Sequence, residues 1–165
     1  MNKPTIVWHK CKPGAKVPTK RAEDAGYDLY TVEKDIILQP HETRLFSIGL
    51  NVAISDGWWL LVKDRGSTGS KGIHVHCGVV DSGYRGELFV CLNNTNDWPV
   101  IFEDPQNPMD KQLIGIRYPV TKGIAQIIPI PAPEVESYEA TDSAWENYFA
   151  HNSERGEGKL GASGK

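Results

Sequence analysis

The feature that most constrains this chain is a hydrophobic pattern of period two, broken into short runs by glycine, proline and aspartate. Valine, isoleucine and aromatic residues dominate the runs, as is typical of β-strands. Most of the 11 prolines lie at run ends, where a missing N–H breaks no ladder. Many short strands of this kind predict an all-β sandwich, jelly roll or barrel. The predicted strands are residues 5–10, 27–32, 35–40, 43–54, 57–63, 72–80, 86–92, 114–120 and 123–131.

Three stretches depart from the strand pattern. Ser143 and Glu146 have the spacing of a capping box, and the aromatic residues that follow share one face, so a short helix is expected near 143–150. A brief helical turn is expected after residues 63–72. Residues 93–109 are polar and rich in proline, which predicts a long loop within an insert at about 93–117.

Length, charge and cysteine content restrict the class of protein. A chain of 165 residues is expected to form one domain, here residues 1–150, with a separate C-terminal tail. The net charge of −3, without long runs of either sign, argues against nucleic-acid and membrane partners. Cys11, Cys77 and Cys91 form no CxxC pair, and no signal peptide or membrane span is evident. These features predict a reduced protein of the cytoplasm, or of the host cytoplasm if the chain is viral.

Several catalytic and metal motifs fail on spacing. The tail "ERGEGKLGASGK" has five residues between Gly158 and Gly164, whereas the phosphate-binding P-loop requires four before its Gly-Lys pair. His74 and His76 share one strand face, but a third metal ligand is not evident, so they are interpreted as ordinary strand histidines. The patterns of zinc deaminases and of serine hydrolases are also absent.

The stretch "GVVDSGYRGEL", residues 78–88, carries the strongest chemical signal. An apolar strand runs into Asp81-Ser82-Gly83-Tyr84 and returns, which predicts a β-hairpin with a tight tip. Asp, Ser and Gly are also ordinary turn residues, so a plain turn is the competing interpretation. The hairpin would nevertheless collect a carboxylate, an aromatic ring and the cation of Arg85 at one rim.

Four other stretches carry polar groups suited to a charged substrate. Asp28 starts a strand in "AEDAGYDLY", and Arg65 precedes several hydroxyls and glycines in "DRGSTGSKG". Gln126 interrupts an apolar run, where its amide needs a partner. Arg155 lies in the glycine-rich tail.

In this order and spacing, the stretches resemble the five motifs of the trimeric, all-β dUTPase family over about residues 22–164. The matching segments are "AGYDL", "DRGSTG", "GVVDSGYRG", "KGIAQII" and "RGEGKLGASG". The second motif departs from the usual Arg-Ser-Gly or Arg-Ser-Ser, which leaves open whether Ser67 or Thr68 meets the phosphates. Leu160 stands where the family usually has an aromatic residue, and Ala162-Ser163 replaces Ser-Thr.

The resemblance implies a distorted jelly roll of the β-clip type and a homotrimer whose sites are built from three subunits. It implies hydrolysis of dUTP to dUMP and pyrophosphate with Mg²⁺, which keeps uracil out of DNA and supplies dUMP for dTMP synthesis. Asp81 would activate the attacking water, and Asp28 would act on the metal through water. The implied substrate-binding residues are Arg65, Gly66, Ser67, Thr68, Gly78, Val79, Val80, Asp81, Tyr84, Phe89, Gln126, Arg155, Leu160, Gly161 and Ser163.

Residues 151–165 would form a lid over this site, with Arg155 and Ser163 on the γ-phosphate. Two alternatives stay open. A dCTP deaminase shares the fold but needs a glutamate base after the hairpin, where this chain has Asp-x-x-Tyr-Arg-Gly. A regulatory protein on the same scaffold would bind a protein partner through the insert at 93–117.

Overall fold

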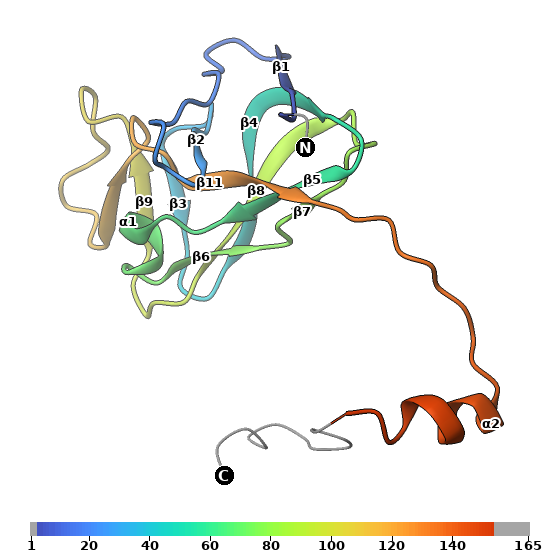
Figure 1. Cartoon of the computed structure of the whole chain (residues 1–165). Coiled ribbons are helices and arrows are strands. Elements are labelled where there is room, and N and C mark those ends of the chain that lie inside the picture. The colour runs from blue at the N-terminus through green and yellow to red at the C-terminus, as the bar shows by residue number, and fades with distance from the viewer. Residues whose placement is uncertain (1–2, 154–165) are drawn as a thin grey trace. The chain divides into compact units, whose positions relative to one another are not determined.

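The structure, a computed structural model, describes residues 3–153. It confirms the predicted all-β class, because strands dominate and helix is confined to short segments (Figure 1). The chain divides into two compact units, Met1–Pro133 and Glu134–Lys165. All described strands belong to the first unit.

Eleven strands form three sheets within the described residues, and no sheet closes into a barrel. The first sheet has the order β1-β4-β8-β6, the second β10-β9-β3 and the third β2-β11-β5-β7. The strands are β1 (Ile6–Lys10), β2 (Tyr27–Leu29), β3 (Ile36–Leu38), β4 (Thr43–Ile54), β5 (Trp58–Lys63), β6 (Ile73–His76), β7 (Val79–Val80), β8 (Glu87–Asn94), β9 (Val100–Glu103), β10 (Ile116–Pro119) and β11 (Ala125–Pro131).

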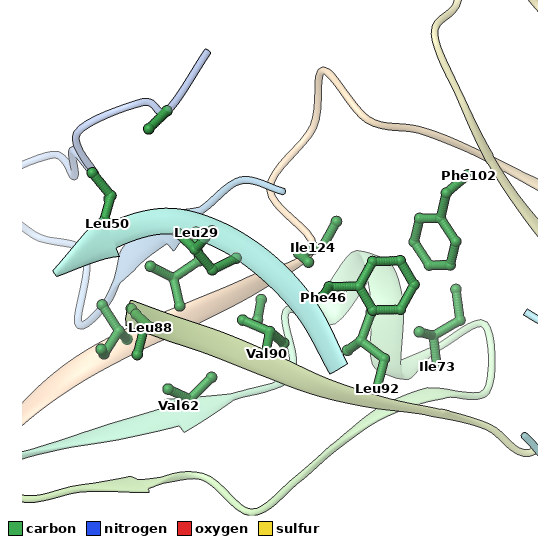
Figure 2. Close-up of a cluster of buried hydrophobic side chains, with 14 of the residues drawn as sticks. Leu29, Phe46, Leu50, Val62, Ile73, Leu88, Val90, Leu92, Phe102 and Ile124 are labelled. Atoms are coloured by element: carbon green, nitrogen blue, oxygen red, sulfur yellow. The ribbon is translucent and has the colours of Figure 1, made fainter. Parts of the chain in front are cut away.

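The core lies against the long strand β4 and its partner β8. Leu50, Leu88, Val90 and Leu92 converge with side chains from the other sheets in one buried cluster (Figure 2). The pairing of β4 with β8 shifts register between Ser47 and Asn51, where β4 is bent. This single strand therefore reaches two parts of the core.

The prediction that residues 93–109 form a loop is wrong for β9. Val100–Glu103 is fully buried and forms the middle strand of the second sheet, antiparallel to β3 and parallel to β10. The Phe102 ring lies 4.8 Å from Phe46 and 5.6 Å from Tyr118, centroid to centroid. An apolar run of three residues among prolines and polar residues gave too weak a strand signal. The surface excursion of the predicted insert is the connection between β9 and β10, residues 104–115.

The predicted hairpin at residues 78–88 is also wrong, because its two arms belong to different sheets. The expected strand 72–80 breaks at Cys77, whose φ of 55° is left-handed. β6 before the break pairs with β8, whereas β7 after it pairs with β5. Gly78 allows this crossing, since a Cβ there would lie 2.3 Å from the Val62 carbonyl oxygen. The turn at Asp81 therefore connects β7, in the third sheet, to β8, in the first sheet.

The second unit contains the predicted short helix. α2 (Asp142–Ala144) continues as the π-helical turn η1 (Trp145–Phe149), and no residue of either is buried. Thr141, rather than Ser143, is the N-cap, because its hydroxyl accepts the Ala144 N–H at 3.3 Å. Within residues 3–153, no helix combines the length and the apolarity needed to cross a membrane.

Candidate functional site

The predicted site residues form two groups in the first unit. We call the first group the Arg65 groove, built from Asp28 on β2, Arg65 and α1 (Gly66–Gly69) after β5, and Gln126 on β11. We call the second group the Asp81 pocket, built from β7, the turn that follows it and the start of β8. Among the residues that the structure describes, none lines both groups.

Arg65 and Asp28 are engaged with each other. Arg65 Nε lies 2.7 Å from Asp28 Oδ1, and Nη2 donates to Oδ2 at 2.9 Å, which is a bidentate pair. The remaining nitrogen, Nη1, donates to the Gly123 carbonyl at 3.1 Å and to Ser67 Oγ at 3.2 Å. The guanidinium is thus fixed by contacts to β2, α1 and the β10–β11 turn.

The α1 turn separates the two candidate hydroxyls. Thr68 is completely buried, and its hydroxyl donates to the Arg65 carbonyl at 3.1 Å while accepting the Arg65 backbone N–H at 3.1 Å. Ser67 is exposed and lines the Arg65 groove. Of the two hydroxyls, Ser67 is therefore the one that a bound molecule can reach.

Gln126 holds the end of β5. Its Nε2 donates to the Asp64 carbonyl at 2.7 Å, which answers the sequence argument that this amide needs a partner. The Asp64 carboxylate accepts the Val75 N–H at 2.6 Å and contacts His74 Nδ1 at 3.0 Å. Partial burial would raise the pKa of Asp64, but these hydrogen bonds hold it below its ordinary value.

The Arg65 groove is an open hollow of about 700 Å³ with a basic wall that the sequence interpretation missed. Lys20 and Arg21 line it together with Thr19 and Asp24. Lys20 Nζ donates to the carbonyls of Arg21, Ala22 and Asp24 at 3.2, 3.4 and 2.7 Å, so it shapes this wall. The adjacent Lys-Arg pair just before "AEDAGYDLY" was the available signal. A smaller hollow of about 370 Å³ lies against the same Asp28–Arg65 pair and is lined by Lys122.

The Asp81 pocket is smaller, about 240 Å³, and largely apolar. Val79, Tyr84 and Phe89 line it, and they expose 65%, 42% and 41% of their surface. The turn is closed by the Tyr84 N–H, which donates to the Asp81 carbonyl at 3.1 Å. Among residues 3–153, no partner is found for the exposed Asp81 carboxylate.

The main chain beside Asp81 has a free edge. β7 is the outer strand of its sheet, and the Gly78 carbonyl accepts the Val62 N–H at 2.7 Å. Because alternate residues of an antiparallel strand bond to the partner, the N–H and C=O of Val79 point away from β5. The Gly78 carbonyl is thus committed to the sheet, whereas the Val79 groups face outward.

The two groups lie far apart in one chain. Val80 pairs with Leu60, so Asp81 is level with the start of β5, whereas Arg65 follows its other end. About six residues of strand at roughly 3.3 Å each separate them by about 20 Å. The remaining predicted residues, Arg155, Leu160, Gly161 and Ser163, lie outside the described part of the chain.

Residues 13–106, more than half of the 165-residue chain, match the dUTPase family. The chain belongs to the dUTPase family. Relatives include the deoxyuridine 5'-triphosphate nucleotidohydrolases of Wolbachia pipientis, 34% identical over 87% of this chain and 82% of the relative, and of Candida albicans, 34% identical over 93% and 84%. The chain also matches the Pol polyprotein of Ovine maedi visna related virus at 37% identity, covering 62% of this chain but only 9% of that polyprotein.

Solved structures of dUTPases share the fold. The dUTPase of Staphylococcus bacteriophage 80alpha, in a variant with dUpNHpp, superposes with a TM-score of 0.73 at 24% identity, covering 96% of this chain and 98% of the phage protein. The dUTPase of phage phi11 of S. aureus, described with a species-specific insert, gives 0.66 at 23% identity, covering 84% and 99%. These likenesses confirm the predicted dUTPase jelly roll.

Proposed function

We propose that this dUTPase-family chain hydrolyses dUTP to dUMP and pyrophosphate. The observation that carries the proposal is the Asp81 carboxylate, which has no partner among residues 3–153 and lies beside an apolar pocket with a free main-chain edge. Of the other described acidic side chains in the two groups, Asp28 is paired with Arg65 and Asp24 is paired with Arg21. Asp81 is therefore the available base.

The proposed reaction is a displacement at the α-phosphorus. Asp81 accepts a proton from a water molecule as the water oxygen attacks, and the bond from the α-phosphorus to the bridging oxygen breaks. Pyrophosphate leaves, and dUMP keeps the new oxygen. Arg65, Ser67 and the Gly66 main chain hold the α- and β-phosphates, where Arg65 supplies charge from a fixed position.

The Asp81 pocket suits a uracil nucleoside. The outward N–H and C=O of Val79 offer one donor and one acceptor to the base edge, and a cytosine would leave such groups unpaired at about 1–3 kcal/mol each. The Tyr84 ring packs under the deoxyribose, where a ribose 2'-hydroxyl would clash. Phe89 adds an apolar contact from β8.

The described residues fit a magnesium ion that arrives with the triphosphate. Among residues 3–153, no cluster of three His, Cys, Asp or Glu side chains could cage a metal. Asp28 keeps unused lone pairs on a partly exposed carboxylate, which suits contact through metal-bound water. The ion would neutralise phosphate charge. In phage phi11 dUTPase, 21% identical, coordination of a structural Mg(II) ion is described.

A separation of about 20 Å between Asp81 and Arg65 does not allow one chain to supply both to the same triphosphate. We infer that each site combines the Asp81 pocket of one copy with the Arg65 groove of another, as in a homotrimer. Residues 151–165 would close over the substrate, with Arg155 and Ser163 on the γ-phosphate and Leu160 and Gly161 across the base.

The β9–β10 excursion favours a second candidate function, binding of a protein partner. Trp98 and Ile114 expose 59% and 74% of their surface. The next residues along the chain, Pro99 and Gly115, lie close to each other. Extended by two residues, the parallel register of β9 and β10 sets Trp98 level with Ile114 at the end of the excursion. Serine at both positions would remove a partner's binding but leave dUTP turnover unchanged.

The test of the primary function is release of pyrophosphate from dUTP, dTTP, dCTP and UTP, with and without Mg²⁺, with ammonia measured in parallel. Pyrophosphate from dUTP alone, strongly increased by Mg²⁺, is the expected result. Ammonia from dCTP would instead identify a deaminase. No turnover of any of the four nucleotides would refute the proposal.

A further inference from the structure

The bend in β4 leaves polar groups without ladder partners. Three residues, Ile48–Leu50, separate Ser47 from Asn51 on β4, whereas only Leu88 separates their partners Phe89 and Glu87 on β8. Gly49 takes a left-handed φ of 69°, and its carbonyl accepts the N–H of Cys11 at 2.9 Å. Because three residues of β4 face a single residue of β8, the Gly49 N–H has no ladder partner on β8.

The Glu87 side chain fills this gap. Its Oε1 accepts the Gly49 N–H at 3.3 Å and the Ser47 hydroxyl, and it lies 2.9 Å from Lys12 Nζ. Lys12 Nζ also donates to Ser47 Oγ at 3.0 Å. Three donors on one oxygen fix the Glu87 side chain, and with it the first residue of β8. We call Glu87, Lys12 and Ser47 the bulge clamp.

The main chain of Glu87, which the bulge clamp holds in place, contacts Tyr84 in the Asp81 pocket. The Tyr84 hydroxyl donates to the Glu87 carbonyl at 2.6 Å, and the ring covers Gly86, where a Cβ would lie 2.6 Å from the Tyr84 oxygen. A tyrosine that is 42% exposed is thus tied at its far end to the residue that the clamp holds.

Lys12 links the clamp to the second aromatic residue of the pocket. Phe89 follows Glu87 by two residues on β8, so both side chains lie on one face of the strand. Lys12 Nζ is 5.7 Å from the centroid of the Phe89 ring while it contacts the Glu87 carboxylate. The Lys12 ammonium group therefore contacts both the Glu87 carboxylate and the Phe89 ring of the Asp81 pocket.

We propose that Glu87, supported by Lys12 and Ser47, is a positioning residue for sugar discrimination: it fixes the Tyr84 ring at the height where deoxyribose fits and ribose does not. This inference rests on the proposed function. Loss of the clamp would let Tyr84 retreat from the sugar, which relieves the clash with a 2'-hydroxyl and admits UTP.

The test is the ratio of kcat/KM for dUTP to kcat/KM for UTP, measured for Glu87→Ala. A smaller fraction of folded protein lowers both constants equally and leaves the ratio unchanged, so this readout separates positioning from stability. We expect the ratio to fall by roughly tenfold, the scale of one lost steric or polar contact. Tyr84→Phe, which removes only the hydroxyl, should lower it similarly, and the double variant should fall no further than the single variants.

Glu33→Ala is the matched control. Glu33 holds the other side of the same bend, since Oε1 accepts the Ser47 N–H at 2.7 Å and Oε2 lies 3.1 Å from Arg44, but it does not contact Tyr84. In Glu33→Ala, the ratio of kcat/KM for dUTP to kcat/KM for UTP should equal that of the unmodified chain. An equal loss in Glu33→Ala, or no loss in Glu87→Ala, would overturn the inference. If Glu87→Ala does not fold, Lys12→Met replaces it. The ratio should then fall by about threefold, the scale of one partly exposed ion pair, and an unchanged ratio would contradict the inference. Absence of dUTP turnover in the unmodified chain would instead refute the proposed function.

Discussion

The Arg65 groove and the Asp81 pocket differ in how far the free chain satisfies its own groups. In the groove, Arg65 and Asp28 form a bidentate pair, and the Gln126 Nε2 group and the Thr68 hydroxyl donate to main-chain carbonyls. In the pocket, the Asp81 carboxylate has no partner among residues 3–153, and the side chains of Val79, Tyr84 and Phe89 are exposed. The groove is prearranged, whereas the pocket is open to a ligand or a second copy.

This difference separates the sources of catalysis. Prearranged charges cost little reorganisation when a triphosphate arrives, so the groove should contribute mainly to binding and charge stabilisation. A carboxylate without a partner retains its capacity to accept a proton, so the pocket should contribute the chemical step. Variants of the two regions should therefore change different kinetic constants.

The largest expected effect is that of Asp81→Asn. Removal of the base should lower kcat for dUTP by about a hundredfold or more, while the amide keeps the shape of the turn and nucleotide binding persists. Steady-state kinetics with a binding titration of a non-hydrolysable dUTP analogue would measure both. Turnover within a few-fold of the unmodified chain would remove Asp81 from the chemical step.

Arg65→Lys should have the next largest effect. Lysine keeps the charge but cannot form the planar two-point contact with Asp28, so the groove loses its fixed geometry. We expect KM for dUTP to rise by roughly tenfold with a smaller change in kcat. A loss confined to kcat would contradict the division of labour between groove and pocket.

A third comparison uses the two adjacent hydroxyls of α1. Thr68→Ala should lower the free energy of unfolding by about 1–2 kcal/mol, because it deletes a buried hydroxyl that closes the turn. Ser67→Ala should leave stability within about 0.5 kcal/mol and raise KM by a few-fold, as expected for an exposed substrate contact. Denaturation midpoints and KM values for dUTP would measure both effects. A larger loss of stability in Ser67→Ala than in Thr68→Ala would refute the assignment of Thr68 to the fold and Ser67 to the substrate.

The smallest expected effect is on acid stability. The pKa of folded Asp64 is lowered, since hydrogen bonds from Val75 and His74 outweigh burial, so its contribution is present above about pH 4 and is lost as pH falls through the folded value. Asp64→Asn should therefore lower the urea midpoint more at pH 7 than at pH 3. Asp97→Asn is the matched control, because Asp97 contacts His41 at 3.1 Å on the exposed surface. Equal losses at both pH values in Asp64→Asn would contradict this account.

The period-two pattern predicted the strand class well, because strands such as β4 and β11 carry long alternating or apolar runs. It failed at β9, where burial by two neighbouring strands, rather than local alternation, decides the structure. It also failed at Cys77, because a change of sheet depends on Gly78 approaching the Val62 carbonyl, a contact between distant residues.

The sequence identified the family motifs but not how their residues pair. The stretch "DRGSTGSKG" left Ser67 and Thr68 equivalent, and only burial distinguishes them. The Arg65–Asp28 pair and the bulge clamp join residues 35 to 75 positions apart, where a local pattern carries no information. The basic wall, by contrast, comes from two adjacent residues, Lys20 and Arg21, so a local pattern does carry its signal.

The most direct test of the central claim is complementation between two impaired variants, assayed at a dUTP concentration below the KM of the unmodified chain. Asp81→Asn retains an intact Arg65 groove, and Arg65→Ala retains an intact Asp81 pocket. If each site combines the two regions from different copies, mixed assemblies of the two variants will turn over dUTP faster than the sum of the two variants measured separately. If turnover in the mixture equals the sum of the separate variants, although mass spectrometry shows that the copies have exchanged, both regions must act within one chain and the account is contradicted.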